Sequence, residues 1–316
     1  MKEELAALEL SHLAKELGET LEGSIIEKIW QPSQRELTIQ LHQSGQPTRF
    51  LKVNSRFVWL SNSKREMPPR PSRFCVTLRS HIERARLREA RQLRFERVLE
   101  LTFERGEQVH KLIFELFSKG NVILCAEDHT IIAAAESQRW TGREIRPGVR
   151  YELPVGRVSL PELNEGAFRE IIRASKRSSV VTAAAIDLGL GGIYAEELCA
   201  RAALDKASSP AELSDKEIAA LFKATRALLE EPAKPRAVYD DGQILDIVPI
   251  ELEIYKGRRQ LAVDSFFDSL SDYLERRSLA RAQEAARAAL VAEIERTKRV
   301  IAEQATRLEE LKAEEE

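Results

Sequence analysis

Three charged side chains interrupt apolar runs of the sequence. Glu9 lies in a segment whose leucines repeat at helical spacing, and Glu96 with Arg97 stands directly before an expected strand. A charged group in an apolar setting must be paired or must bind a ligand. We therefore expect Glu9, Glu96 and Arg97 to form a polar site. The alternative is an internal salt bridge that ties the first helix to the strand.

Arginine is concentrated between Lys64 and Arg105. This window holds twelve Lys or Arg and six Asp or Glu, so it carries +6, whereas the whole chain carries −2 and the remainder −8. We predict a helix that starts at Pro71 and Ser72, carries the arginines from residue 79 on and runs into a strand at 98. We also predict that its arginines bind a polyanion, because the guanidinium fork makes bidentate contacts to phosphate. These arginines are Arg79, Arg84, Arg86, Arg88, Arg91, Arg94 and Arg97. The alternative is a solvated helix whose arginines pair with neighbouring glutamates.

A glycine-rich turn separates two helical segments near residue 190. Gly189, Gly191 and Gly192 allow a tight turn whose free N–H groups face outward, and the following helix offers its positive end. This is the character of a helix–hairpin–helix, which binds a nucleic-acid phosphate without reading sequence. The alternative is a simple glycine-bent corner between helices.

No arrangement typical of an enzyme or a cofactor site is visible in the sequence. It contains no Ser/His/Asp set, Cys/His pair, P-loop or dinucleotide fingerprint, so we expect neither catalysis nor a cofactor. The histidines form no cluster with metal-ligand spacing. Cys75, Cys125 and Cys199 are far apart, which is typical of buried thiols in a reducing cytosol. No apolar run approaches the roughly 20 residues that span a bilayer, and the charged N-terminal segment is not a signal peptide, so we expect a cytoplasmic protein without a membrane partner.

Alternating apolar residues and hairpin turns predict a largely antiparallel sheet with a helix packed on each side, hence an α+β fold. A first helix is expected over residues 3–22. The expected strands are 25–31, 36–41, 50–60, 98–104, 109–116, 121–126 and 130–136.

Four regions are expected along the chain. Residues 1–160 form the α+β domain and 161–232 an inserted helical domain, with breaks at 189–192 and 208–210. Residues 233–262 hold strands at 237–240 and 247–255, too few for a domain, which we expect to return to the first sheet. Residues 263–316 form a coiled-coil arm, because Ile294, Ile301 and Leu308 repeat every seven residues. Such a helix needs a partner, either a downstream return helix or a second chain, so we expect a truncated piece of a longer protein.

Several stretches of the sequence resemble the Rqc2/NEMF/RqcH (FbpA-type) family, whose first domain is called NFACT-N, and they follow one another in the same order as in that family. Residues 74–103 follow its pattern of a leucine–arginine helix, a glutamine, an acid–arginine pair and a strand. The run KLIFELFSKGN at 111–121 and the segments 143–154, 188–204 and 248–257 match its later parts. The composition, rich in Glu and Arg and poor in Met, is typical of a thermophile, and we expect an archaeal member.

The resemblance implies a ribosome quality control factor. Members bind the large ribosomal subunit carrying stalled peptidyl-tRNA and hold a tRNA, so that the nascent chain is extended at its C-terminus without mRNA. The family's acidic residue in the first helix falls on Glu9, and its Asp-Arg motif, needed for tail synthesis, falls on Glu96 and Arg97. Both acidic positions carry Glu where the family has Asp, which keeps the charge but moves the carboxylate by one methylene. Peptide-bond chemistry would belong to the ribosome, so the chain is not expected to be an enzyme.

Two other functions fit parts of this pattern. A DNA glycosylase of the formamidopyrimidine type would need an N-terminal proline as nucleophile, whereas this chain begins Met1-Lys2 and lacks zinc-finger cysteines. A protein–protein scaffold or adhesion protein, as some bacterial relatives were once described, is opposed by the absence of a secretion signal and by the buried-thiol pattern.

Overall fold

The computed structural model describes residues 2–64, 67–154 and 159–315, and side chains as far as Leu308. The chain forms two compact units, Met1–Ser271 (unit 1) and Asp272–Glu316 (unit 2). The division into four regions stays a prediction.

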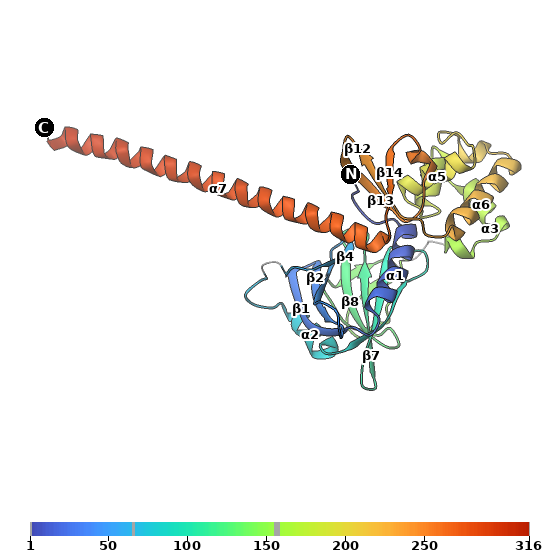
Figure 1. Ribbon diagram of the computed structural model, residues 1–316, viewed down its shortest axis with the longest axis horizontal. Helices are drawn as coiled ribbons and strands as arrows, with labels where there is room; N and C mark the ends of the chain where they lie inside the picture. Colours follow the sequence, from blue (N-terminus) through green and yellow to red (C-terminus); the bar gives the residue numbers. More distant parts are fainter. Residues whose placement is uncertain (1, 65–66, 155–158, 316) are drawn as a thin grey trace. The chain divides into compact units, whose positions relative to one another are not determined.

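A nine-stranded antiparallel sheet dominates the first half of unit 1 (Figure 1). Its strand order is β4-β3-β2-β1-β5-β6-β7-β8-β9, so neighbours in sequence are mostly neighbours in space. The strands are β1 (Ile25–Ser33), β2 (Glu36–His42), β3 (Arg49–Val53), β4 (Val58–Ser61), β5 (Arg86–Gln92), β6 (Val98–Arg105), β7 (Gln108–Glu115), β8 (Asn121–Ala126) and β9 (Ile131–Ala134). The predicted meander and the α+β class are confirmed. A short hairpin of β10 (Gln138–Trp140) and β11 (Arg143–Ile145) was not predicted.

Two helices pack on this sheet. The leucine stripe of α1 (Ala7–Leu21) is buried, and the helix lies against β5. The second helix, α2 (Arg73–Ile82), begins where the Ser72 hydroxyl accepts the N–H of Cys75 at 3.0 Å, a normal N-cap. It contacts β1, β6 and the edge strand β9, so the sheet curves around it.

The predicted arginine-rich helix is wrong beyond Ile82. Arg84 has a left-handed backbone with φ of 64°, which ends α2, and the chain then enters β5. β5 pairs with β6 from Arg86 opposite Glu104 to Gln92 opposite Leu99, with a bulge after Leu87. Arg, Glu, Ala and Leu favour a helix locally, but the ladder to β6 and the contact with α1 outweigh that preference.

The expected strand at 50–60 is two strands. β3 and β4 are separated by a turn in which the Asn54 side-chain oxygen accepts the N–H groups of Arg56 at 2.9 Å and Phe57 at 2.8 Å. Asparagine stabilises such turns by this local bond.

A helical block follows the sheet and confirms the helical prediction for 162–230. Its helices are α3 (Glu165–Ala174), α4 (Val180–Ile186), α5 (Gly192–Arg201) and α6 (Asp215–Glu230), with single 3₁₀ turns at Leu160–Glu162 (η1) and Pro210–Glu212 (η2). The predicted breaks near 190 and 209 separate α4 from α5 and α5 from α6. A capping box of Ser214 and Glu217 starts α6.

The later strands do not return to the first sheet, so that expectation is wrong. In the described chain, β12 (Arg236–Asp240), β13 (Gln243–Val248) and β14 (Arg259–Ala262) form their own three-stranded sheet in the order β13-β12-β14. The predicted strand at 247–255 ends at Val248 and is followed by the 3₁₀ turn η3 (Glu253–Tyr255). The small sheet packs on the helical block instead, because Val238 and Val248 share one apolar core with α3, α5 and α6.

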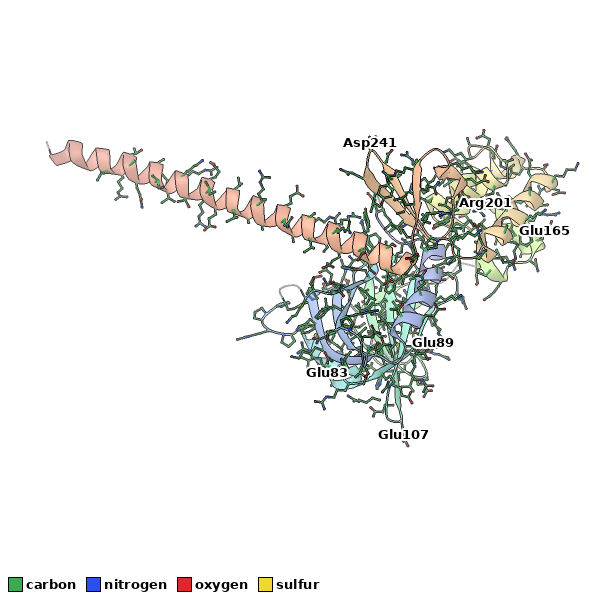
Figure 2. The ribbon with its side chains drawn as sticks, in the orientation of Figure 1. Glu83, Glu89, Glu107, Glu165, Arg201 and Asp241 are labelled. Atoms are coloured by element: carbon green, nitrogen blue, oxygen red, sulfur yellow. The ribbon has the colours of Figure 1, made fainter. Side chains whose placement is uncertain are left out.

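Arg201 joins the helical block to the segment before η3. It lies at the end of α5 (Figure 2), where its Nε donates to Glu197 at 2.6 Å and its Nη2 donates to the carbonyl oxygen of Glu251 at 3.0 Å. Its Nη1 also pairs with Glu231, just after α6. One guanidinium therefore fixes α5 relative to two neighbouring segments.

The long helix α7 (Phe266–Glu315) begins in unit 1 and makes up unit 2. A long helix in this region is confirmed from Phe266 to Glu315, whereas the predicted coiled-coil arm over 263–316 stays a prediction. Ile294, Ile301 and Leu308 are 53, 59 and 55% exposed, so the seven-residue seam is open to solvent. The partner that would cover this seam stays a prediction.

Cys75, Cys125 and Cys199 are free and buried, as expected. Throughout the described residues, no helix has the length and apolar character needed to cross a bilayer.

Candidate nucleic-acid interface

A cleft of about 470 Å³ lies where four parts of unit 1 meet. These parts are the segment leading into α1, the residue before β6, the glycine turn before α5, and β13 with η3. The polar and glycine residues that line it are Lys2, Glu3, Glu4, Glu9, Arg97, Gly189, Gly191, Gly192, Asp246 and Tyr255. Glu9, Arg97 and the three glycines, which the sequence analysis singled out separately, therefore share one cleft.

Glu9 is buried at the edge of this cleft, with 1% of the residue exposed. It is the third residue of α1, and its Oε2 accepts the N–H of Ala6 at 2.9 Å, which caps the helix at its positive end. Its Oε1 accepts from Lys2 Nζ at 2.6 Å and from the Tyr194 hydroxyl at 3.0 Å. The carboxylate is thus committed to internal partners.

Lys2 lies between two carboxylates. Besides Glu9, its Nζ donates to Asp246 Oδ1 at 2.7 Å and to the carbonyl oxygen of Ile247 at 3.0 Å, and its side chain is only 2% exposed. Burial alone would lower the pKa of Lys2, but the attraction and hydrogen bonds of Glu9 and Asp246 outweigh this and raise it. The ammonium is therefore held in its charged form.

Two tyrosines complete this buried cluster, which we call the lysine cluster (Lys2, Glu9, Tyr194, Asp246, Tyr255). The Tyr255 hydroxyl donates to Asp246 Oδ2 at 2.9 Å. Burial, followed by the nearby Glu9 carboxylate, raises the pKa of Tyr194 well above its usual value, so both hydroxyls remain donors. Burial also raises the pKa of Glu9, although Lys2 offsets part of that effect.

The lysine cluster joins elements that are far apart in the sequence: the segment before α1, α1 itself, α5 and β13. Sequence reasoning found only Glu9. Asp246 carried the same signal, a charge inside the apolar run of β13, and could have been found by it. Lys2 and the tyrosines carried none, because their pairing depends on the tertiary fold.

Arg97 lines the same cleft as residues of the lysine cluster and has its own partner. Its Nη1 is 2.6 Å from Glu4 Oε1, and the two side chains are 20% and 53% exposed. The polar site expected at Glu9, Glu96 and Arg97 stays a prediction: Glu9 and Arg97 line one cleft, and each has an ion-pair partner outside this set. Internal ion pairs, the alternative, are present with other partners: Lys2 for Glu9, and Glu4 for Arg97.

The loop that carries Glu96 and Arg97 is tied to α1 by one side chain. Gln92 Nε2 donates to the carbonyl oxygens of Ala7 and Glu96, both at 2.8 Å. Glu96 is 8% exposed and does not line the cleft. Gln92 thus holds Arg97 close to the start of α1.

The glycine turn adopts the conformation that its composition predicts. Gly189 and Gly191 have φ of 75° and 79°, a region that costs other residues free energy. Gly191 is the N-cap of α5, and a Cβ atom there would be 3.9 Å from the Cβ of Ala6. The first N–H groups of α5, at Gly192 and Ile193, have no intrahelical partner by helix geometry, and these residues line the cleft. The positive end of α5 is therefore available to an anion.

The seven arginines are not one surface. Arg79 donates to the carbonyl oxygen of Ile29 at 2.6 and 2.8 Å, and Arg86 to that of Gly23 at 2.9 Å. These two side chains satisfy backbone groups of their own fold, which the sequence analysis did not foresee.

The other five divide into two groups. Arg88 pairs with Glu104, and Arg91 Nη2 is 2.7 Å from Glu100; Arg97 is paired as described above. The side chains of Arg84 and Arg94 are exposed and have no ion-pair or hydrogen-bond partner among the described residues.

No group of three or more His, Cys, Asp or Glu side chains in the described chain is arranged to hold a metal ion.

The fold and the cleft define a class of protein. Residues 7–316 match the family of NFACT N-terminal and middle domains, and the chain belongs to this family. The resemblance found in the sequence is thereby confirmed.

Relatives with names extend the comparison. The chain is 32% identical over 286 residues to the archaeal Rqc2 homolog aRqcH of Methanocaldococcus jannaschii, which covers 86% of this chain and 42% of the relative. It is 28% identical over 293 residues to the Rqc2 homolog RqcH of Streptococcus suis, covering 80% and 52%. It is 33% identical over 135 residues to ribosome quality control complex subunit 2 of Saccharomyces cerevisiae, covering 42% and 13%. The chain thus spans about half or less of the length of these relatives.

Two solved structures share the fold. The N-terminal part of the fibronectin/fibrinogen-binding protein of Streptococcus suis matches with a TM-score of 0.65 at 24% identity, over 85% of this chain and 98% of that one. The fibrinogen binding protein of Staphylococcus aureus matches with a TM-score of 0.64 at 19% identity, over 85% and 98%.

Proposed function

We propose that this chain is the tRNA-facing part of a ribosome quality control factor. In this role it binds the large ribosomal subunit carrying stalled peptidyl-tRNA and recruits a tRNA for extension of the nascent chain without mRNA. The names of the relatives from Methanocaldococcus jannaschii and Saccharomyces cerevisiae support this role. Peptide-bond formation would be carried out by the ribosome in the cytoplasm, and the chain would supply binding and placement.

One observation carries the proposal: the cleft combines a guanidinium with the free N–H groups of a helix start. Arg97 can make charge-assisted hydrogen bonds to a phosphate, and the first turn of α5 offers backbone donors and a partial positive charge. Such contacts position a nucleic-acid backbone without reading its sequence. The glycines let a ligand approach the backbone closely because they carry no side chain.

The lysine cluster contributes four residues to the lining of this cleft and holds the lining elements together. Because the Glu9 carboxylate is buried, its role is to hold Lys2 and the N-cap of α1, not to touch RNA. The segment that carries Glu4 is thereby fixed beside Arg97. The Glu side chain, one methylene longer than Asp, reaches Ala6, Lys2 and Tyr194 together, so both carboxylate oxygens of Glu9 already accept hydrogen bonds within the fold.

The test is to sequence the RNA that crosslinks to the chain in its native cells, together with co-sedimentation with large ribosomal subunits. Wild-type chain should enrich one tRNA plus large-subunit rRNA, and Arg97→Ala should lose most of the tRNA signal. Arg35→Ala is a matched control, because Arg35 pairs with Glu136 at 2.8 Å and is similarly half-buried but lies outside the cleft.

Absence of tRNA from the wild-type crosslinks would overturn the proposal. An equal loss of tRNA in the Arg97→Ala and Arg35→Ala variants would show that the cleft is not the tRNA-binding site. Large-subunit binding with no RNA contact would instead favour a protein–protein scaffold.

A further inference from the structure

A second recess, of about 590 Å³, lies beside the turn between β5 and β6. Its walls are that turn and the segment 150–154, and His129 from the β8–β9 turn also lines it. The charged and histidine residues of its lining are Arg91, Arg94, His129, Arg150 and Glu152. We name it the basic pocket. It shares no lining residue with the cleft that holds Arg97.

A buried carboxylate organises one wall of the basic pocket. Glu100 is fully buried, and its Oε1 accepts from Arg91 Nε at 2.9 Å and Nη2 at 2.7 Å. Its Oε2 is 2.7 Å from His129 Nε2, and Lys111 Nζ lies 3.3 Å from the ring of His129. One acid thus fixes two cationic or polar groups and has a third cation close by. The charge of Glu100 is therefore balanced by Arg91 and His129 within the wall.

The opposite side of the pocket presents cations without partners. Arg94 and Arg150 are exposed, and neither guanidinium has a hydrogen-bond or ion-pair partner among the described residues. Arg94 is held in a left-handed turn conformation with φ of 51°, and Arg150 is held by a bridge between its backbone and Thr130. Their backbones are therefore fixed, while neither guanidinium is held in a close ion pair; Asp128 interacts with Arg150 electrostatically.

The charges of the pocket favour an anion that contacts more than one cation at once. Within the pocket lining, Arg91, Arg94 and Arg150 outnumber the single carboxylate, Glu152, and Glu100 behind the wall has no exposed surface. Asp128, near Arg150, is the acid that interacts with this guanidinium from outside the lining. Aromatic rings that could stack a base are not exposed here, because Tyr151 is only 6% exposed and its hydroxyl donates to Glu115. The pocket is suited to phosphate contacts, not to base recognition.

We infer that the basic pocket binds a backbone phosphodiester of the same RNA whose neighbouring part enters the Arg97 cleft. This inference rests on the proposed function. Arg94 lines the pocket and Arg97 lines the cleft, and the two residues lie three positions apart in one turn, so a single strand that crosses the turn can contact both. Arg94 and Arg150 make the contacts, and Glu100 acts through Arg91 and His129 as a positioning residue.

The experiment measures binding of a tRNA mixture to the full chain over a series of salt concentrations. Arg94→Ala and Arg150→Ala should each weaken binding and reduce the slope of log affinity against log salt by roughly 0.7 to 0.9, the value of one lost phosphate contact. The double variant should lose about twice that. Both residues are exposed and unpaired, so melting temperatures should stay at the wild-type value.

Arg88→Ala is the matched control. It removes the same charge from β5, the strand that leads into the turn of Arg94, but Arg88 pairs with Glu104 and does not line the pocket. Its slope should equal that of the wild type. An equal loss of slope for Arg88→Ala and Arg94→Ala would show a diffuse field of charge and overturn the pocket.

The remaining outcomes separate this inference from the proposed function. If wild type binds tRNA, Arg97→Ala weakens it and the Arg94 and Arg150 variants behave as wild type, the basic pocket fails while the proposed function stands. If wild type does not bind tRNA, both fail. Addition of millimolar AMP should leave tRNA bound; displacement by AMP that depends on Arg94 would assign the pocket to a mononucleotide and overturn the backbone contact.

Discussion

Replacing Lys2 with methionine tests whether the lysine cluster holds the N-terminal segment in place. Methionine keeps the length and apolar stem of the side chain but removes contacts at 2.6, 2.7 and 3.0 Å. It leaves Glu9 and Asp246, whose side chains are 1% and 3% exposed, without a countercharge. Removing one partner of a buried ion pair typically costs about 3–5 kcal/mol of the free energy of unfolding.

We expect the lower end of this range. Glu9 keeps the donors Ala6 N–H and Tyr194 hydroxyl, and Asp246 keeps those of Ile247 and Tyr255. A loss of about 3 kcal/mol in a unit of this size lowers the melting temperature by about 6–12 °C. Lys15→Met, the same change at an exposed position of α1, should leave the melting temperature unchanged.

The pH dependence gives a second readout. The pKa of Glu9 in the folded chain is raised by burial and rises further without Lys2, whereas in the unfolded chain it lies near about 4.3. The loss of folding free energy caused by the unneutralised Glu9 carboxylate is therefore complete above the folded pKa. It shrinks as the pH falls toward the unfolded pKa and disappears below that value. The pKa of folded Lys2 is raised, so the wild type keeps its ammonium across this range.

Calorimetry from pH 7.5 down to pH 5 should show the gap between wild type and Lys2→Met narrowing. A variant that melts with the wild type at neutral pH, or a gap that does not change with pH, would refute the reasoning that Lys2 neutralises two buried carboxylates.

Three further predictions concern single contacts. Glu4→Gln frees Arg97 from an exposed ion pair and should raise tRNA affinity about twofold to fivefold in filter binding. Glu3→Gln is the control, because it removes the same charge from the cleft without releasing Arg97. Equal effects of the two variants would contradict a specific role of the Glu4–Arg97 pair. Gly191→Ala should cost about 1–2 kcal/mol in urea unfolding, because its φ of 79° strains a residue with a side chain while the nearest atom leaves room. Glu100→Gln should cost about 1–3 kcal/mol by the same assay, since its fully buried oxygens lose charge-assisted bonds; an unchanged urea midpoint would mean that the wall of the basic pocket does not need this acid.

The meander of strands was predictable because its signals are local. Apolar alternation marks β6, β7 and β8, and the tight turns at Gly106 and Gly120 separate them, both with positive φ. The helical block was predictable for the same reason, from helical spacing and its glycine break. β5 was not, because its Arg, Glu and Ala composition favours a helix and only its ladder with β6 makes it a strand.

The candidate site was predictable residue by residue but not as a geometry. Glu9 and Arg97 stood out as charges in apolar runs, and Gly191 as part of a tight turn. Their partners did not, because Lys2 meets Asp246 across 244 positions of sequence and Glu4 lies in an ordinary charged segment. Local patterns identify which side chains are unusual, whereas the fold decides which of them meet.

The Arg201 guanidinium described above has a consequence for genetic screens. It fixes α5 against the segment before η3, and α5 and η3 contribute Ile193 and Tyr255 to the cleft although Arg201 itself lies outside it. A selection for loss-of-binding alleles should therefore recover changes at Arg201 alongside those at Arg97. Alleles at Arg201 would act by displacing a wall of the cleft, so a second change nearby that restores the width of the cleft should rescue them. Alleles at Arg97 remove a contact with the ligand, and no distant change should replace it.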